Sequence, residues 1–337
     1  MPKEAETIKR VLVTGASGFI GTNLVKRLVE DGYEVTTLGR TGTVPRALRE
    51  LPVSHISCDV TNVEQLDQSF MDAKFDCLFH LAGLVSYQAK DVQRQFAVNV
   101  IGTRNVMNAA LKHNIKRVVY TSSIAAMGLP KEGSVGTEEI VYNLGGRGLN
   151  YCDSKYTAEL EVLDAWKRGL PVLILSPGIT LGEGDTHSHH KAIVNAMAGK
   201  SLIFVPPGGV TFSDINDVVD AHINAMTKGR TGERYSIVSD NLSFADAARK
   251  YCKVFKTNPR IIVVPGFVLM GLSAVAEWRE KYFKKPPILS KQQAWLSQHK
   301  IFFSSAKAEE ELDFKPTSFE TTIERTAGFY IGEAKST

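Results

Sequence analysis

The sequence of 337 residues is short of cysteine, of long apolar runs and of charge of one sign. Its four cysteines, Cys58, Cys77, Cys152 and Cys252, lie far apart and form no C-x-x-C pair, which argues against a disulfide framework or a zinc site and favours a reducing compartment. The net charge is only +4, so nothing indicates a nucleic-acid partner. The first ten residues are polar and contain no apolar signal segment, and we expect a cytoplasmic protein.

The composition is that of an ordinary globular protein, with 43% hydrophobic and 23% charged residues. From residue 11 to about 176, short β-branched or apolar runs alternate with stretches of helical period, which is typical of βαβ units and a parallel sheet. The expected strands are residues 11–14, 35–38, 55–58, 77–81, 118–122 and 172–175, and the expected helices are residues 21–31, 64–72, 96–113 and 151–166. After Pro177 the alternation stops, and one further strand is expected at residues 235–238.

These patterns predict an α/β fold built on a doubly wound parallel sheet, with a smaller, mostly helical C-terminal region. We expect residues 1–176 to form the sheet domain, with residues 207–240 returning to it. Residues 177–206 and 241–330 would then form a substrate-binding region.

A glycine-rich turn follows the first predicted strand and opens directly into the first helix. Residues 14–21 are T-G-A-S-G-F-I-G, so the glycines have the spacing G-x-x-G-x-x-G. The first glycine allows a tight turn, the second lets the backbone approach a pyrophosphate, and the third lets helix and strand pack closely. The helix N-terminus presents N–H groups to the anion. Strand, turn and helix in this order predict a dinucleotide-binding site.

The residue that contacts the adenosine ribose is expected about 20 positions further on, where an acid would bind the 2′-hydroxyl and an arginine a 2′-phosphate. Arg40 stands at this place, and no Asp or Glu occurs between Val35 and Arg49. We therefore favour NADP(H), with NAD(H) as the alternative; Arg40 would otherwise be a solvated surface residue. Asp59 and Val60, after the third strand, are expected near the adenine.

Tyr151 and Lys155 are four residues apart on a predicted helix, so their side chains project from one face. An ammonium near a phenol favours the phenolate and lowers its pKa, which suits a tyrosine acting as general acid–base. On its own this spacing is also explained by a solvated tyrosine and lysine. Ser122 and Ser123, at the end of a predicted strand, add hydroxyls at the carboxyl edge of the sheet, where doubly wound folds bind ligands.

With these motifs in place, the chain resembles the extended short-chain dehydrogenases/reductases, the NAD-dependent epimerase/dehydratase family, whose members have a Rossmann fold. The matching segments are residues 14–21, 80–83 (H-L-A-G), 99–103, 121–128, 151–155 (Y-x-x-x-K), 176–179 and 303–308. Residues 229–235 carry a narrower likeness, to dihydroflavonol-reductase-like and hopanoid-associated sugar-epimerase-like members. The resemblance also implies a homodimer that forms through the helices at residues 96–113 and 151–166.

The resemblance implies a role for each residue that matches a motif. Ser123 would hydrogen-bond the substrate oxygen, and Tyr151 would pass the proton. Lys155 would bind the nicotinamide ribose and hold the Tyr151 pKa down, and Asn99 would support the proton relay. The predicted cofactor-binding residues are Gly15, Ser17, Gly18, Phe19, Ile20, Gly21, Arg40, Asp59, Val60, Leu81, Ala82, Gly83, Ser122, Tyr151, Lys155, Pro177, Gly178 and Ile179.

Two departures from the family pattern narrow the predicted reaction. Residues 175–180 lack the Asn that helps many sugar-nucleotide epimerases hold a diphosphate, and Ile124 and Ala125 replace the acidic pair of dehydratases. We therefore predict an NADP(H)-dependent oxidoreductase that transfers a hydride between the nicotinamide and a carbonyl or secondary alcohol of a fairly apolar small molecule. The alternatives are a nucleotide-sugar epimerase and a non-catalytic NADP(H)-binding regulatory protein, which would need only the glycine turn and Arg40.

Two further segments are not explained by this site. Residues 261–276 are nearly all apolar but too short to span a membrane. With the basic and aromatic residues that follow up to 285, they suit either an interfacial membrane anchor or a buried helix lining the substrate pocket, and we favour the buried helix. His187, His189 and His190 lack the spacing of a tetrahedral site, so no metal is expected.

Overall fold

The computed structural model describes residues 8–71, 74–185, 201–283 and 289–335. Its main element is a seven-stranded sheet in which every strand pair is parallel. The strands are β1 (Arg10–Thr14), β2 (Glu34–Gly39), β3 (Ser54–Ser57), β4 (Cys77–His80), β5 (Arg117–Thr121), β6 (Val172–Pro177) and β10 (Arg234–Ile237). Their spatial order is β3-β2-β1-β4-β5-β6-β10, the order of a doubly wound Rossmann sheet with one strand added. The predicted fold class is therefore confirmed, and all seven predicted strands are present.

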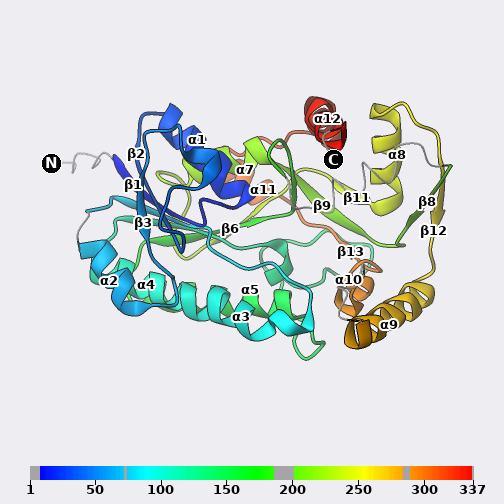
Figure 1. Cartoon of the computed structure of the whole chain (residues 1–337), viewed down its shortest axis with the longest axis horizontal. Coiled ribbons are helices and arrows are strands. Elements are labelled where there is room, and N and C mark those ends of the chain that lie inside the picture. The colour runs from blue at the N-terminus through cyan, green and yellow to red at the C-terminus, as the bar shows by residue number, and fades with distance from the viewer. Residues whose placement is uncertain (1–7, 72–73, 186–200, 284–288, 336–337) are drawn as a thin grey trace.

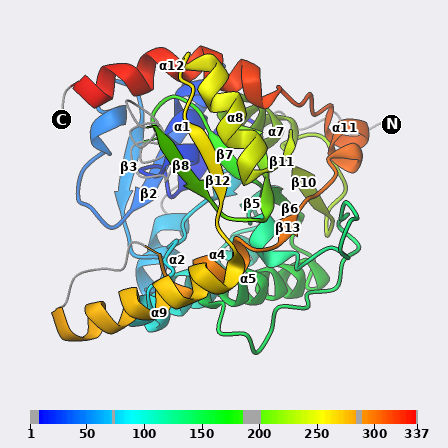
Figure 2. The same ribbon diagram turned by 90° about the vertical axis from the view of Figure 1, so that its right-hand side faces the viewer.

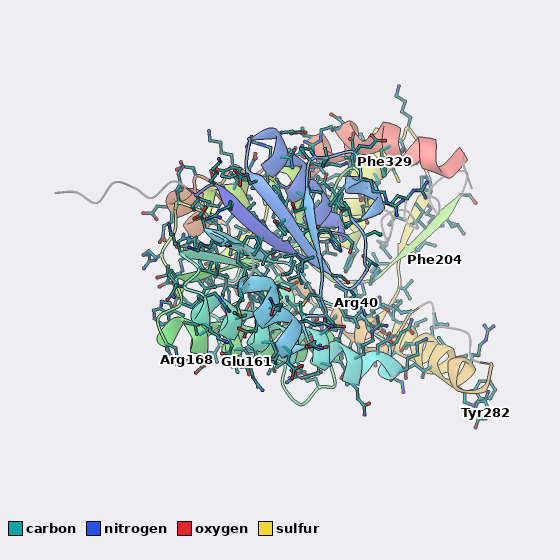
Figure 3. All side chains as sticks on the ribbon, turned by 60° about the vertical axis from the view of Figure 1, so that its left-hand side comes forward. Arg40, Glu161, Arg168, Phe204, Tyr282 and Phe329 are labelled. Carbon is teal, nitrogen blue, oxygen red and sulfur yellow. The ribbon has the colours of Figure 1, made fainter. Side chains whose placement is uncertain are left out.

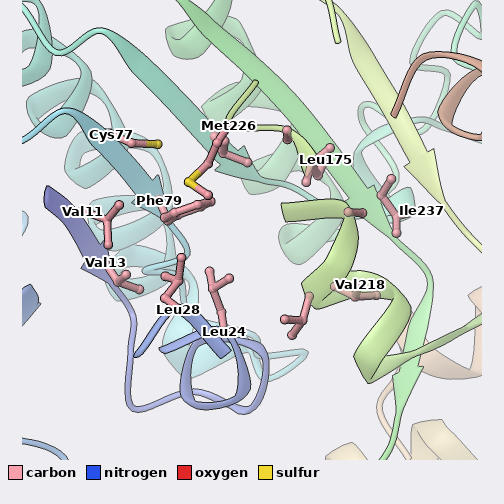
Figure 4. Close-up of a cluster of buried hydrophobic side chains, with 14 of the residues drawn as sticks. Val11, Val13, Leu24, Leu28, Cys77, Phe79, Leu175, Val218, Met226 and Ile237 are labelled. Atoms are coloured by element: carbon pink, nitrogen blue, oxygen red, sulfur yellow. The ribbon is translucent and has the colours of Figure 1, made fainter. Parts of the chain in front are cut away.

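Helices cover both faces of this sheet, as Figure 1 shows. One face carries α1 (Phe19–Glu30), α7 (Ile215–Asn224) and α11 (Ala306–Leu312), and the other carries α2 (Val63–Met71), α4 (Thr103–Lys112) and α5 (Asn150–Lys167). Because side chains alternate along a strand, Val11 and Val13 pack in the core beside α1 and α7, while Leu12 between them packs in the core beside α4 and α5. Figure 4 shows the first of these cores. The uninterrupted apolar run of β1 is what a strand covered on both faces requires.

The helix predicted at residues 96–113 is interrupted. The structure has α3 (Val92–Phe96), a π-helical segment at Ala97–Gly102 and then α4. The π-helical turn contains Asn99, and such turns are frequent at functional sites.

The C-terminal part contains six short strands that the sequence did not reveal, besides α8 (Phe244–Val254), α9 (Gly266–Phe283), α10 (Lys291–Leu296) and α12 (Phe319–Lys335) (Figure 2). The strands are β7 (Ile179–Leu181), β8 (Leu202–Val205), β9 (Gly209–Asp214), β11 (Asn241–Ser243), β12 (Arg260–Val263) and β13 (Lys300–Ile301). β9 is the centre of this part, since it pairs with β7, β11 and β13, whereas β8 and β12 pair with each other.

The apolar segment at residues 261–276 is divided between β12 and α9. The burial that we favoured for it is found on one face of α9 only: Leu269 and Ser273 are buried, whereas Phe267 and Val275 are exposed. No helix within the described residues has the length and apolar content to cross a membrane.

Candidate active site

The glycine turn between β1 and α1 has no room for side chains at two of its three glycines. Gly15 has a φ of +75°, and a Cβ there would lie 2.6 Å from the backbone nitrogen of Ala82. A Cβ on Gly21 would lie 2.3 Å from the carbonyl oxygen of Gly15. The contact of Gly15 places the turn directly against the backbone that follows β4, and the contact of Gly21 brings the start of α1 close to the turn itself. Gly18, the N-cap of α1, provides no side-chain cap, so the first N–H groups of the helix remain available to an anion.

Arg40 lies immediately beyond the carboxyl end of β2, is exposed, and is labelled in Figure 3. Asp59 follows β3, and its Oδ1 accepts hydrogen bonds from the backbone N–H and the hydroxyl of Thr61 at 2.9 and 2.8 Å. Burial alone would raise the pKa of Asp59, but these hydrogen bonds and the nearby charges of Arg40 and Arg94 lower it. The structure therefore brings Arg40 and Asp59 near each other beyond the carboxyl ends of β2 and β3.

Ser123 and Tyr151 meet at the carboxyl end of β5. Ser123 lies two residues beyond the end of β5 and caps the short 3-10 helix Ile124–Ala126, where its Oγ accepts from the Ala125 N–H at 3.2 Å. Burial raises the pKa of Tyr151 to about 12, and a hydrogen bond with Ser123 limits the increase. At neutral pH the Tyr151 phenol is therefore protonated and able to donate its proton.

Lys155 is buried, and its ammonium is not directed to Tyr151. Nζ donates to the Tyr120 Oη at 2.9 Å and to the Thr121 carbonyl oxygen at 2.9 Å, and it lies 4.7 Å from the centre of the Tyr120 ring. Burial lowers the Lys155 pKa to about 8, and the charge of buried Glu159 partly offsets this. The expected lowering of the Tyr151 pKa by Lys155 is not found in this arrangement. The largest influence on the Tyr151 pKa is the burial of its own hydroxyl, which raises it.

A row of buried polar side chains continues behind Tyr120. A hydrogen bond links Tyr120 with Thr103, whose Oγ1 lies 3.0 Å from His80 Nε2. His80 Nδ1 in turn lies 2.7 Å from Thr14 Oγ1, which accepts from the Ala82 N–H at 3.2 Å. This Tyr120–Thr103–His80–Thr14 row connects the lysine to the first residue of the glycine turn. Burial, and then the charge of Lys155, lower the His80 pKa to about 3, so His80 is neutral.

Asn99 holds the loop after β4 and the start of α5 in place. Its Oδ1 accepts from the Leu84 N–H at 2.7 Å, and its Nδ2 donates to the Leu84 carbonyl at 3.1 Å and to Ser154 Oγ at 3.0 Å. Ser154 Oγ donates to the Tyr151 carbonyl oxygen at 2.9 Å. Asn99 is thus two hydrogen bonds away from the backbone of Tyr151. The π-helical turn supplies the local geometry for these contacts.

The other predicted residues lie around this centre. Ser122 is buried beside Glu159, on the α5 side of the sheet. Gly83 lies near Asn99, since a Cβ there would be 3.4 Å from Asn99 Oδ1, and Gly178 donates its N–H to Ser213 Oγ at 3.0 Å. The turn residues Ser17, Phe19 and Ile20, and also Val60, Leu81, Pro177 and Ile179, occupy the predicted segments at the ends of β1, β3, β4 and β6.

Two residues that the sequence analysis did not assign also belong to the site. They are Tyr120 and Tyr87, whose ring lies edge-on to the Tyr151 ring with 5.6 Å between their centres. Tyr120 has a signal in the sequence, because it precedes Ser122 by two positions and the predicted strand 118–122 places both on one face. Tyr87 lies outside any regular element and has no such signal. His187, His189 and His190 lie outside the described residues, and no cluster able to hold a metal occurs within them.

This geometry is that of a doubly wound α/β protein with hydroxyl groups at the carboxyl edge of its sheet, and comparison with known proteins specifies the class. The model of the NAD dependent epimerase/dehydratase family matches residues 11–238. The chain belongs to this family. A putative dihydroflavonol 4-reductase of Synechocystis sp. is 29% identical over 316 residues, which cover 92% of this chain and 91% of that protein.

Two further matches are informative. A 3-beta-hydroxysteroid dehydrogenase of Mycolicibacterium neoaurum is 29% identical over 329 residues, covering 91% of this chain and 87% of that protein. The crystal structure of a UDP-glucose 4-epimerase from Thermotoga maritima, solved with UDP-glucose, has a TM-score of 0.77 at 19% identity and covers 96% of this chain and 99% of its own, which shows a shared fold. The chain is an enzyme of the oxidoreductase type, an extended short-chain dehydrogenase/reductase.

Proposed function

We propose that the enzyme interconverts a carbonyl and a secondary alcohol on a fairly apolar small molecule, with NADP(H) as its cofactor. The observation that carries the proposal is the hydrogen bond that pairs Ser123 with Tyr151 at the carboxyl edge of the sheet. Two hydroxyls at one point can hydrogen-bond a carbonyl oxygen and stabilise the negative charge that develops there, and Tyr151 can deliver the proton.

The residues present fit a nicotinamide dinucleotide. The cradle at Gly15 and Gly21 excludes side chains, the N-terminus of α1 suits a pyrophosphate, and Arg40 suits a 2′-phosphate. The family is NAD-dependent, and Arg40 is the reason to favour the phosphorylated form. The cofactor supplies the hydride, and the residues of this chain orient the substrate and move the proton at the Tyr151 hydroxyl.

The apolar substrate is supported by the relatives, which are named as acting on a dihydroflavonol and a 3-beta-hydroxysteroid. Epimerisation of a nucleotide sugar remains the second candidate, because the family description includes epimerases and a UDP-glucose 4-epimerase shares the fold. It predicts cofactor that survives purification and no net change in nicotinamide absorbance during turnover. A purely regulatory role is disfavoured, because it would not need Ser123 and Tyr151.

The test is Tyr151→Phe, assayed by nicotinamide absorbance on hydrophobic ketones, steroids and nucleotide sugars. We expect a loss of turnover of about 10²–10⁴-fold, the usual contribution of a positioned general acid, with cofactor affinity nearly unchanged. Tyr156→Phe, on the same helix and stacked on Tyr142 at 4.2 Å, is the matched control and should keep full activity. Equal activity of Tyr151→Phe and wild type would refute the assignment of the proton donor.

A further inference from the structure

The outer face of α9 is apolar and exposed. Five of the seventeen large hydrophobic side chains exposed in the described part of the chain belong to this one helix: Phe267 (79%), Leu272 (58%), Val275 (58%), Trp278 (55%) and Tyr282 (62%). A soluble protein rarely leaves so many large apolar side chains together in water without a function for them.

The helical geometry shows that four of these five residues form a stripe along the helix. Phe267, Val275, Trp278 and Tyr282 follow one another at intervals of eight, three and four residues, which places them within an arc of about 80° on a helix of 3.6 residues per turn. Leu269 and Ser273, which are buried, lie on the opposite side, where α9 packs against α10. Glu277, near this packed side, pairs with Lys291 at 3.1 Å. The helix is therefore fixed to the protein by one face and presents an apolar face to the outside.

The position of α9 makes this face accessible. The helix projects from the body of the molecule in Figure 2, and Tyr282 lies at its outer end in Figure 3. The Trp278 and Tyr282 rings contact each other, with 5.0 Å between their centres. Tryptophan and tyrosine at the end of an apolar stripe are the side chains that proteins place at the level of lipid headgroups.

The segment of sequence that begins directly after Trp278 is positively charged. Residues 279–285 read R-E-K-Y-F-K-K, four cations against one acid, or +3, while the whole chain carries only +4. Arg279, directly after Trp278, is exposed. A basic segment that follows an apolar helical segment in the sequence complements an anionic lipid surface, where each cation contributes about 1 kcal/mol of attraction.

We propose that α9 is an interfacial helix that binds the enzyme to the surface of an anionic membrane, with the stripe of Phe267, Val275, Trp278 and Tyr282 inserted at the headgroup level. This inference concerns the exposed face of α9, which contains none of the residues placed in the active site. It is independent of the proposed reaction, because binding is measured without turnover.

The test is co-sedimentation of the full chain with vesicles of phosphatidylcholine, alone or mixed with phosphatidylglycerol. We expect binding to the anionic vesicles, weakened by salt. The double substitution Phe267→Ser and Trp278→Ser should reduce the affinity about a hundredfold, since it removes two large inserted side chains. The matched control is Val63→Ser with Met71→Ser, two side chains of α2 that are 61% and 62% exposed, which should bind as wild type does.

A fluorescence measurement identifies the inserted residue. The chain has three tryptophans, so Trp166→Phe with Trp295→Phe leaves Trp278 as the sole reporter. Its emission should shift to shorter wavelength on addition of anionic vesicles, and brominated lipids should quench it. Absence of vesicle binding by the wild type would overturn the proposal. So would a wild-type dimer that the Phe267→Ser and Trp278→Ser variant dissociates, because the stripe would then be an interface between two copies.

Discussion

The hydroxyl of Tyr120 is positioned to keep Lys155 charged, and Tyr120→Phe removes that hydroxyl while keeping the ring. A hydrogen bond from a charged donor contributes about 1.5–3 kcal/mol, and one pKa unit corresponds to about 1.4 kcal/mol. Loss of the 2.9 Å bond from Nζ should therefore lower the Lys155 pKa from about 8 by about one to two units. For a decrease of one unit, the charged fraction at pH 8.5 falls about eightfold.

The assay is the pH profile of kcat/KM for wild type and Tyr120→Phe. We expect the basic limb to move toward acid by about one unit or more, so that the variant is most impaired above pH 8 and nearly normal below pH 6. Tyr235→Phe is the control, because that buried hydroxyl accepts from the Arg230 N–H at 2.7 Å and does not contact Lys155. A uniform loss of activity at every pH, with the limb unmoved, would refute the role given to Tyr120.

Two further predictions test the buried row and the cofactor preference. The His80 pKa, about 3 when folded and about 6.5 when unfolded, means that stability is lost as pH falls from 6.5 toward 3, by about 2 kcal/mol between pH 7.5 and 5. In urea unfolding at these two pH values, His80→Gln should lose about 2 kcal/mol less of its unfolding free energy than wild type does. Equal losses in the two proteins would contradict the shift of the His80 pKa. Arg40→Ala should lower the preference for NADPH over NADH about tenfold or more in a binding titration, whereas exposed Arg49→Ala should not; an unaltered ratio would place the phosphate contact at Thr41 or Arg46.

The strands of the parallel sheet could be predicted from the sequence because their burial is continuous. Four strands of the sheet, β1, β4, β5 and β6, are covered on both faces and consist largely of apolar and β-branched residues. Apolar runs of this short length are typical of buried parallel strands. The predicted boundaries differ from the observed ones by one or two residues. The glycine turn could also be predicted from the sequence. Its glycines are required where backbone atoms come too close for a Cβ, as at Gly15 and Gly21.

β9 could not be predicted in this way. All six of its residues are buried, yet it contains glycine, threonine, serine and aspartate as well as valine and phenylalanine. Its polar side chains are satisfied by distant partners: Thr211 Oγ1 bonds to Asn241 Oδ1 at 2.5 Å, and Ser213 Oγ donates to the Ile237 carbonyl at 2.6 Å. Apolar and polar residues alternate in β9 over only four positions, Val210 to Ser213, and the strand lacks the continuous apolar run that marks β1. The π-helical turn could not be predicted either, because Asn99 is fixed by Leu84 and Ser154.

Side chains along β5 alternate between the two faces of the sheet, so one strand contributes groups to several parts of the site. Tyr120 and Ser122 face α5, so the first reaches Lys155 and the second lies beside Glu159. Thr121 faces the other layer, where its Oγ1 lies 2.7 Å from His222 Nε2 of α7. Its carbonyl oxygen still accepts from Lys155, because backbone groups lie in the plane of the sheet. The lysine is thus held by a side chain and by the strand itself, and Tyr120→Phe should shift its pKa without displacing it.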